Sequence, residues 1–209
     1  AGIIRATDNS FGIKGVASGV DLYAVKTMNQ DGEAYLSQVI AGIDWAIENN
    51  MDIINLSLST QSDSLVFKNI IDKAYQNGIL IVAASGNDVT GFGDTVDFPA
   101  RYSSVIAVGA IDAQNRLASF SSTGPSVEVV APGVSVLSTY LNGSYARMNG
   151  TSMAAPFISG YLALIKEAYP KLSNFQLRSI LLENTLDLGL PSLDPLFGNG
   201  LIKASRLTM

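Results

Sequence analysis

The residues best suited to chemistry lie in one stretch, residues 149–156, where small residues surround the hydroxyl of Ser152. An apolar segment, residues 157–168, follows directly and covers more than one helical face, which predicts a helix buried nearly all round. Ser152 would then lie at the helix N-terminus, where free N–H groups and the helix dipole favour negative charge. A serine there can act as a nucleophile beside an oxyanion donor, or it can simply cap the helix.

A second polar group follows another predicted element. Residues 79–84 form an apolar run that predicts a buried strand, and Asn87 comes directly after it. An amide at the carboxyl end of a strand can donate to a developing oxyanion. The alternative is an ordinary turn residue after Gly86.

The elements that must position these groups alternate along the chain. Helical spacing predicts helices over residues 36–47 and 66–74, while residues 52–58 and 79–84 predict buried strands. This alternation is typical of an α/β fold with a mainly parallel sheet flanked by helices, whose strands bind ligands at their carboxyl ends. We expect one domain, residues 1–209. Further predicted elements are the tail of a helix at 1–6, strands at 22–26, 105–110, 118–120, 127–131, 134–139 and 145–148, and a helix at 174–184, followed by a loop-rich tail.

Composition excludes several classes of protein. Hydrophobic residues make up 47% of the chain and charged residues 15%, which excludes a disordered protein. The net charge of -5 argues against nucleic acid or an anionic membrane as partner, and no apolar stretch is long enough to span a membrane. The chain has no Cys, which excludes disulfides, and no His, which removes the usual general base and zinc ligand.

Five short motifs together resemble the subtilisin-like serine proteases over nearly the whole chain. They are GTSMAAP (150–156), AASGN (83–87), INLSL (54–58), YAVK (23–26) and APG (131–133). The resemblance implies the three-layer subtilisin-like fold. It also implies that Ser152 is the nucleophile and Asn87 the oxyanion donor.

The departures from this family concern the general base. In the family a His lies in a His-Gly-Thr-His-Val-Ala-Gly motif that opens a helix, and this sequence starts with the closing Ala-Gly. The orienting Asp and the first strands of the sheet are also expected before residue 1. We therefore expect an N-terminally incomplete catalytic domain, inactive alone, whose partner is an N-terminal segment of the same protease carrying Asp and His. Sedolisins use Glu as the base, but they place an Asp where this chain has Asn87.

The resemblance also implies where a peptide substrate binds. It would lie as an added strand between the edge segments 32–34 and 57–59. The predicted substrate-binding residues are Gly32, Glu33, Ala34, Ser57, Leu58, Ser59, Ala84, Ser85, Gly86 and Asp97. Asp97 falls at the floor of the primary pocket, where a carboxylate would favour Lys or Arg. The alternative is that Asp97 turns outward or caps a loop.

A calcium site is implied by the same resemblance. The loop of residues 7–13 would bind Ca²⁺ through the carbonyls of Thr7, Phe11 and Ile13 and the side chain of Asn9. The remaining ligands would come from the absent segment, so this chain alone should bind calcium weakly. The alternative is a solvated surface loop.

The predicted function is a secreted serine endopeptidase, with an intracellular subtilisin as the alternative location. Its partners would be a peptide or protein substrate and an inhibitory propeptide. Two other functions stay open, a catalytically inactive relative that binds peptides or acts as a scaffold, and an esterase or amidase.

Overall fold

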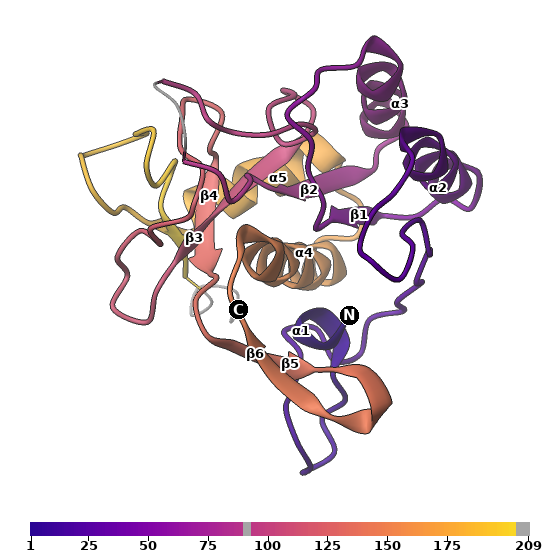
Figure 1. Ribbon diagram of the computed structural model, residues 1–209, viewed down its shortest axis with the longest axis horizontal. Coiled ribbons are helices and arrows are strands. Elements are labelled where there is room, and N and C mark those ends of the chain that lie inside the picture. The colour runs from indigo at the N-terminus through magenta and orange to yellow at the C-terminus, as the bar shows by residue number, and fades with distance from the viewer. Residues whose placement is uncertain (90–92, 204–209) are drawn as a thin grey trace.

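The computed structural model describes residues 1–89 and 93–203. A six-stranded sheet in the order β1-β2-β3-β4-β8-β7 forms its centre, and its strands are parallel except for β7 (Figure 1). Strands β5 and β6 form a separate antiparallel pair. The predicted α/β class with a mainly parallel sheet is confirmed.

Helices and strands have the following bounds along the chain. The helices are α1 (Gly2–Arg5), α2 (Leu36–Glu48), α3 (Leu65–Gln76), the 3-10 turn η1 (Leu141–Gly143), α4 (Thr151–Ala168) and α5 (Asn174–Glu183). The strands are β1 (Ile53–Leu56), β2 (Leu80–Ala84), β3 (Ile106–Ile111), β4 (Val129–Pro132), β5 (Val136–Thr139), β6 (Tyr145–Met148), β7 (Thr185–Leu186) and β8 (Leu201–Ile202).

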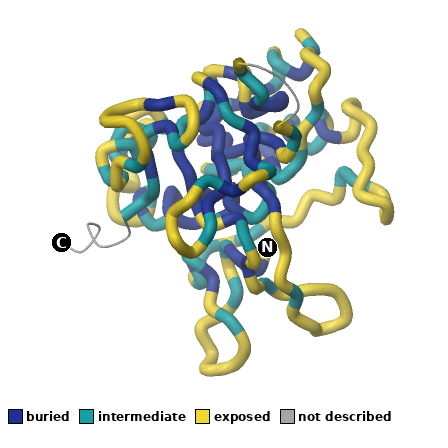
Figure 2. The backbone as a smooth tube through the Cα atoms, turned by 60° about the vertical axis from the view of Figure 1, so that its left-hand side comes forward, coloured by how far each residue is buried: buried dark blue, intermediate teal, exposed yellow. Residues whose placement is uncertain are grey.

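Two apolar cores lie on opposite faces of the sheet. Along β2 the side chains alternate, with Ile81 and Ala83 in the core beneath α2 and α3, and Leu80 and Val82 in the core beneath α4 and α5. Every residue of β2 and β3 is buried, as expected for strands that are covered on both faces (Figure 2). The fold therefore has three layers.

Helix α4 packs across β1, β2, β3 and β4 and is the most buried helix of the chain's described part. Ten of its eighteen residues are buried, which agrees with the predicted helix that is apolar nearly all round. Its first residue, Thr151, follows Gly150, whose φ of 143° lies in the region that favours glycine. The chain therefore turns sharply into the helix at the carboxyl edge of the sheet.

Two predicted strands are wrong. Residues 22–26 form no ladder with any described residue. Strand β1 lies at the edge of the sheet and pairs only with β2. Residues 118–120 pair only at their start, where Ala118 N–H donates to Ala110 O at 2.9 Å, and then turn as Ser121 N–H bonds to Ala118 O. Residues 201–202 form β8 within the predicted loop-rich tail.

The described residues include no helix that is both long enough and apolar enough to cross a membrane.

Candidate active site

Ser152 lies in the first turn of α4, as predicted, and is tied to the segment after β1. Its Oγ donates to the carbonyl of Ser57 at 3.2 Å, and the Ser57 Oγ donates back to the carbonyl of Ser152 at 2.9 Å. Pro156 explains the second bond. Because proline has no N–H, the carbonyl four residues before it, that of Ser152, lacks its helical partner and is free to accept from Ser57.

A chain of polar side chains beneath Ser57 was not predicted from the sequence. Asn55 on β1 donates from Nδ2 to Ser57 Oγ at 2.9 Å, and Ser159 on α4 donates to Asn55 Oδ1 at 2.9 Å. The only signal was a polar residue inside the apolar run of β1. These bonds tie α4 to β1 and so help to position Ser152.

Asn87 lies beside the start of α4, with its side chain oriented by that helix. Its Oδ1 accepts the N–H of Thr151 at 2.9 Å and lies 3.0 Å from Thr151 Oγ1. Because two donors hold the oxygen, the Nδ2 group is left to donate elsewhere, and Asn87 is exposed. The N–H of Ser152 is a first-turn donor without a helical partner. A Cβ added to Gly150 would lie 3.5 Å from Asn87 Nδ2 and 3.7 Å from the Ser152 nitrogen, so these two donors lie near each other at the start of α4.

A general base is missing from this arrangement. The chain contains no His, and the hydroxyl proton of Ser152 goes to a peptide carbonyl, which cannot take it up. Among the described residues no carboxylate is hydrogen-bonded to Ser152. In the part of the chain that the structure describes, no imidazole or carboxylate is therefore in place to accept the hydroxyl proton of Ser152.

The side chain of Asp97 is turned inward, and its carboxylate accepts no backbone N–H from a described residue. The residue is only 9% exposed, and its Oδ2 accepts the hydroxyl of Ser59 at 2.8 Å. A Cβ added to Gly86 would lie 2.5 Å from the same oxygen, so the carboxylate packs against the residue before Asn87. Asp97 thus joins the segment after β1 to the segment after β2.

Aromatic packing and hydrogen bonds hold the loop behind Asp97. The ring of Phe98 lies 4.9 Å from that of Tyr102, whose hydroxyl donates to Asp63 at 2.8 Å. Burial, together with the hydrogen bond to Asp63, raises the pKa of Tyr102 to about 12. The hydroxyl holds this loop in place through its bond to Asp63.

The other predicted substrate-binding residues differ in accessibility. Gly32, Glu33 and Ala34 are exposed in a turn held by Asn29 Oδ1, and Ser59 is exposed as well, while Ser57 and Leu58 are half-buried. Ala84, Ser85 and Gly86 are buried. Within the described part of the chain, no hydrogen bond joins the turn at 32–34 to the segment 57–59.

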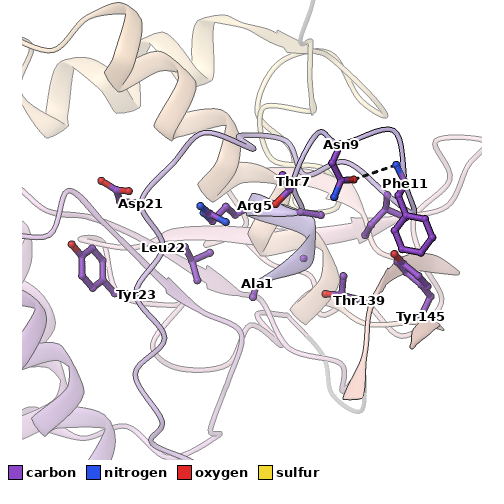
Figure 3. Close-up of a pocket in the computed structure, with 13 residues that line it drawn as sticks. Ala1, Arg5, Thr7, Asn9, Phe11, Asp21, Leu22, Tyr23, Thr139 and Tyr145 are labelled. Carbon is purple, nitrogen blue, oxygen red and sulfur yellow. Dashed lines mark hydrogen bonds between the residues drawn. The ribbon is translucent and has the colours of Figure 1, made fainter. Parts of the chain in front are cut away.

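The four residues of the predicted calcium loop border one cavity of about 560 Å³ (Figure 3). Asn9 Oδ1 also accepts the N–H of Phe11 at 3.2 Å. Arg5 and Asp21 line the same cavity. No group of three or more acidic, His or Cys side chains that could hold a metal occurs among the described residues. The loop fits calcium in part, because it offers neutral oxygens but fewer than the six to eight that Ca²⁺ takes.

Comparison with known families gives a match over nearly the whole chain. A model described as the subtilase family matches residues 1–200. The chain is 49% identical over 203 residues to the minor extracellular protease Epr of Bacillus subtilis (strain 168), covering 97% of this chain and 31% of that protein. It is 48% identical over 190 residues to subtilisin DY of Bacillus licheniformis, covering 90% of this chain and 69% of that protein.

A solved structure shares the fold. Fervidolysin from Fervidobacterium pennivorans, described as a keratinolytic enzyme related to subtilisin, matches with a TM-score of 0.89 and 29% sequence identity. The match covers 99% of this chain and 34% of fervidolysin. The chain thus spans about a third of Epr and of fervidolysin.

Proposed function

The chain belongs to the subtilase family, and from that premise we propose that it is the part of a serine endopeptidase that carries the nucleophile and the oxyanion donors. Ser152 Oγ would attack the peptide carbonyl, and the carbonyl oxygen would become negatively charged. Asn87 Nδ2–H and the N–H of Ser152 would stabilise that charge. The observation that carries this proposal is the orientation of Asn87, whose oxygen is held by Thr151.

The proton of Ser152 has to leave before or during attack. We propose that a His takes it up and later gives it to the leaving amine, and that an Asp orients this His. Both would come from a segment of the same protease that lies outside these 209 residues. The carbonyl of Ser57, which now accepts the Ser152 hydroxyl at 3.2 Å, would then lose this bond to the imidazole.

The substrate would be an extended peptide. Main-chain bonds to the exposed turn at 32–34 and to residues 57–59 would hold it as an added strand. This mode of binding separates a peptidase from an esterase, because an ester has no main-chain N–H groups to offer. An inhibitory propeptide could occupy the same segments.

Two measurements test the proposal. A fluorophosphonate should label Ser152 stoichiometrically in the native protein that contains this chain, and Ser152→Ala should abolish labelling. Denaturing intact-mass spectrometry of the same material should show either a second polypeptide or a longer chain that carries His. Absence of labelling together with tight peptide binding would instead support an inactive, peptide-binding relative.

We also propose that Thr7, Phe11 and Ile13 carbonyls and Asn9 Oδ1 hold a structural Ca²⁺, with further ligands from the segment outside this sequence. Added Ca²⁺ should raise the unfolding temperature of the native protein, and Asn9→Ala should remove most of that rise. Asn69→Ala, an exposed change on α3, is the matched control. An equal rise in all three proteins would contradict this site.

Secretion is the location that the relatives support, since one of them is named as an extracellular protease. We propose that the protease acts outside the cell. Recovery of the Ser152-labelled protein from the culture medium of the source organism would support this, and recovery only from the cell lysate would contradict it.

A further inference from the structure

Ser159 is a polar residue in the buried part of α4, and the proposed reaction assigns it no role. It is only 3% exposed. It follows Ser152 by seven residues, about two helical turns, so both residues lie on the same face of the helix. Its hydroxyl lies 3.3 Å from the carbonyl of Ala155, which already accepts a helical N–H. The helix itself therefore does not need this hydroxyl, which has a second partner outside α4.

The second partner lies on the neighbouring strand. The Ser159 hydroxyl donates to Asn55 Oδ1 on β1 at 2.9 Å, a shorter bond than the one within its own helix. Asn55 Nδ2 donates to Ser57 Oγ at 2.9 Å, and Ser57 Oγ donates to the carbonyl of Ser152 at 2.9 Å. Three hydrogen bonds, called the Ser159 network below, thus lead from Ser159 through β1 back to the residue that carries the nucleophile.

Pro156 decides in which direction the protons of the Ser159 network point. A hydroxyl can donate or accept and an amide can turn over, so hydrogen-bond chemistry alone allows either direction. In the reverse direction the carbonyl of Ser152 would receive no proton from Ser57, and Pro156 has no N–H to offer in its place. A half-buried carbonyl without a donor costs free energy. The network therefore runs from Ser159 towards Ser152.

This direction has two consequences for the reacting oxygen. A hydroxyl that donated to Ser152 Oγ would occupy a lone pair that is needed for attack, and Ser57 instead gives its proton to the carbonyl of Ser152. The bond from Ser152 Oγ to the Ser57 carbonyl is lost in the proposed reaction when the hydroxyl proton leaves, whereas the bond from Ser57 Oγ remains. The remaining bond then holds Ser152 to the segment after β1.

We propose that Ser159 is a positioning residue for the nucleophile and acts through Asn55 and Ser57. This inference rests on the proposed peptidase function. Ser159 orients the amide of Asn55, and that amide orients the hydroxyl of Ser57. The hydroxyl in turn holds the carbonyl of Ser152 in place. Because small displacements of a reacting atom slow the reaction more than they weaken binding, loss of the Ser159 hydroxyl should lower kcat and leave KM unchanged.

The first test is Ser159→Ala in the active native protein. Alanine forms helices better than serine, so α4 should be kept, and urea titration checks that the variant is folded under assay conditions. We expect kcat, and the second-order rate constant of fluorophosphonate labelling, to fall about 3- to 10-fold. Ser179→Ala is the matched control and should change neither rate. The Ser179 hydroxyl likewise bonds back within its helix, to the Phe175 carbonyl at 3.1 Å, but has no other hydrogen-bond partner among the described residues.

A double-mutant cycle with Ser57→Ala separates positioning from packing. Ser57→Ala alone should lower the labelling rate about tenfold or more, because the carbonyl of Ser152 loses its donor. If Ser159 acts through Ser57, adding Ser159→Ala to this variant should change the rate by less than about twofold. A contribution from packing of the Ser159 side chain does not depend on Ser57, and its loss would lower the rate by the same factor in both backgrounds.

The extent of labelling distinguishes this role from the function on which it rests. Wild-type protein that is labelled at Ser152, with rates unchanged in Ser159→Ala or with equal factors in both backgrounds of the cycle, would overturn the role of Ser159 and leave the peptidase function standing. A rise in KM at constant kcat would do the same. Wild-type protein that is neither labelled nor active would overturn the peptidase function and, with it, this role.

Discussion

In two regions of the molecule a buried aspartate packs against a glycine with a positive φ angle. The two regions differ in the number and kind of hydrogen-bond donors to the carboxylate. In the tail, Asp194 packs against Gly189, and Oδ1 accepts the N–H groups of Leu196 at 2.7 Å and Phe197 at 3.0 Å. At the carboxyl edge of the sheet, Asp97 packs against Gly86 with one hydroxyl donor. The local packing is alike, but the hydrogen bonding is not.

The two carboxylates thus differ in how far the protein itself satisfies them. The three N–H bonds on Asp194 offset the loss of its water contacts and hold the loop of residues 190–197 together. At the carboxyl edge of the sheet, by contrast, Asn87 Nδ2 and Asp97 Oδ1 have no hydrogen-bond partner among the described residues. Changes at the sheet edge should alter chemistry, and changes in the tail should alter stability.

The largest effect is expected from Ser152→Ala. Turnover of peptides by the active native protein should fall about 10⁶-fold, a magnitude carried over from subtilisin itself, because the nucleophile is lost. The free energy of unfolding from urea titration should change by less than about 1 kcal/mol, since Ser152 Oγ makes one long bond. A large loss of stability would place Ser152 with the structural groups.

Asn87→Ala should have the next largest effect. The kcat should fall about 100- to 1000-fold with little change in KM, because the amide acts on charge that develops during reaction; this range, too, comes from subtilisin. Steady-state kinetics on one peptide series measure both constants, with Asn69→Ala as control. A rise in KM at constant kcat would show that Asn87 binds substrate instead.

Asp194→Asn should show the reverse pattern. One oxygen becomes an NH₂ group that faces a backbone donor, so the unfolding free energy should fall by about 1–3 kcal/mol. The kcat of the folded variant should be unchanged. Urea titration measures the unfolding free energy, and kinetics below the unfolding transition measure kcat. A fall in kcat without a fall in the unfolding free energy would contradict the assignment of Asp194 to a structural role.

The smallest effect is expected from Ser59→Ala, which removes the single donor to Asp97. The kcat/KM for Arg peptides should fall about 3- to 10-fold, because the carboxylate is less well oriented, while that for Phe peptides stays constant. Parallel assays on the two peptides measure the ratio. Equal losses on both would assign Ser59 a general structural role.

Much of the fold was predictable because buried strands and helices appear in the sequence as apolar runs or as apolar residues at helical spacing. The apolar runs at 79–84 and 105–110 correspond to β2 and β3, and the helix after Ser152 is α4. The segment 22–26 has the composition of a strand but no partner, and Tyr23 instead lies beside Trp45 of α2, with 6.0 Å between the ring centres. Pairing is a property of two segments, so composition alone could not decide it.

The sequence by itself determined the alternation of strands and helices, the place of Ser152 at a helix start, and the polar residues that follow each strand. Periodicity and turn chemistry act over a few residues, and so they can be read along the chain. Only the tertiary structure decided which polar groups meet. Ser57 and Ser152 are 95 residues apart, and Ser59 and Asp97 are 38 apart. Whether such distant atoms come within about 3 Å depends on how α4 and the neighbouring strands β1 and β2 pack, which is a property of the whole core.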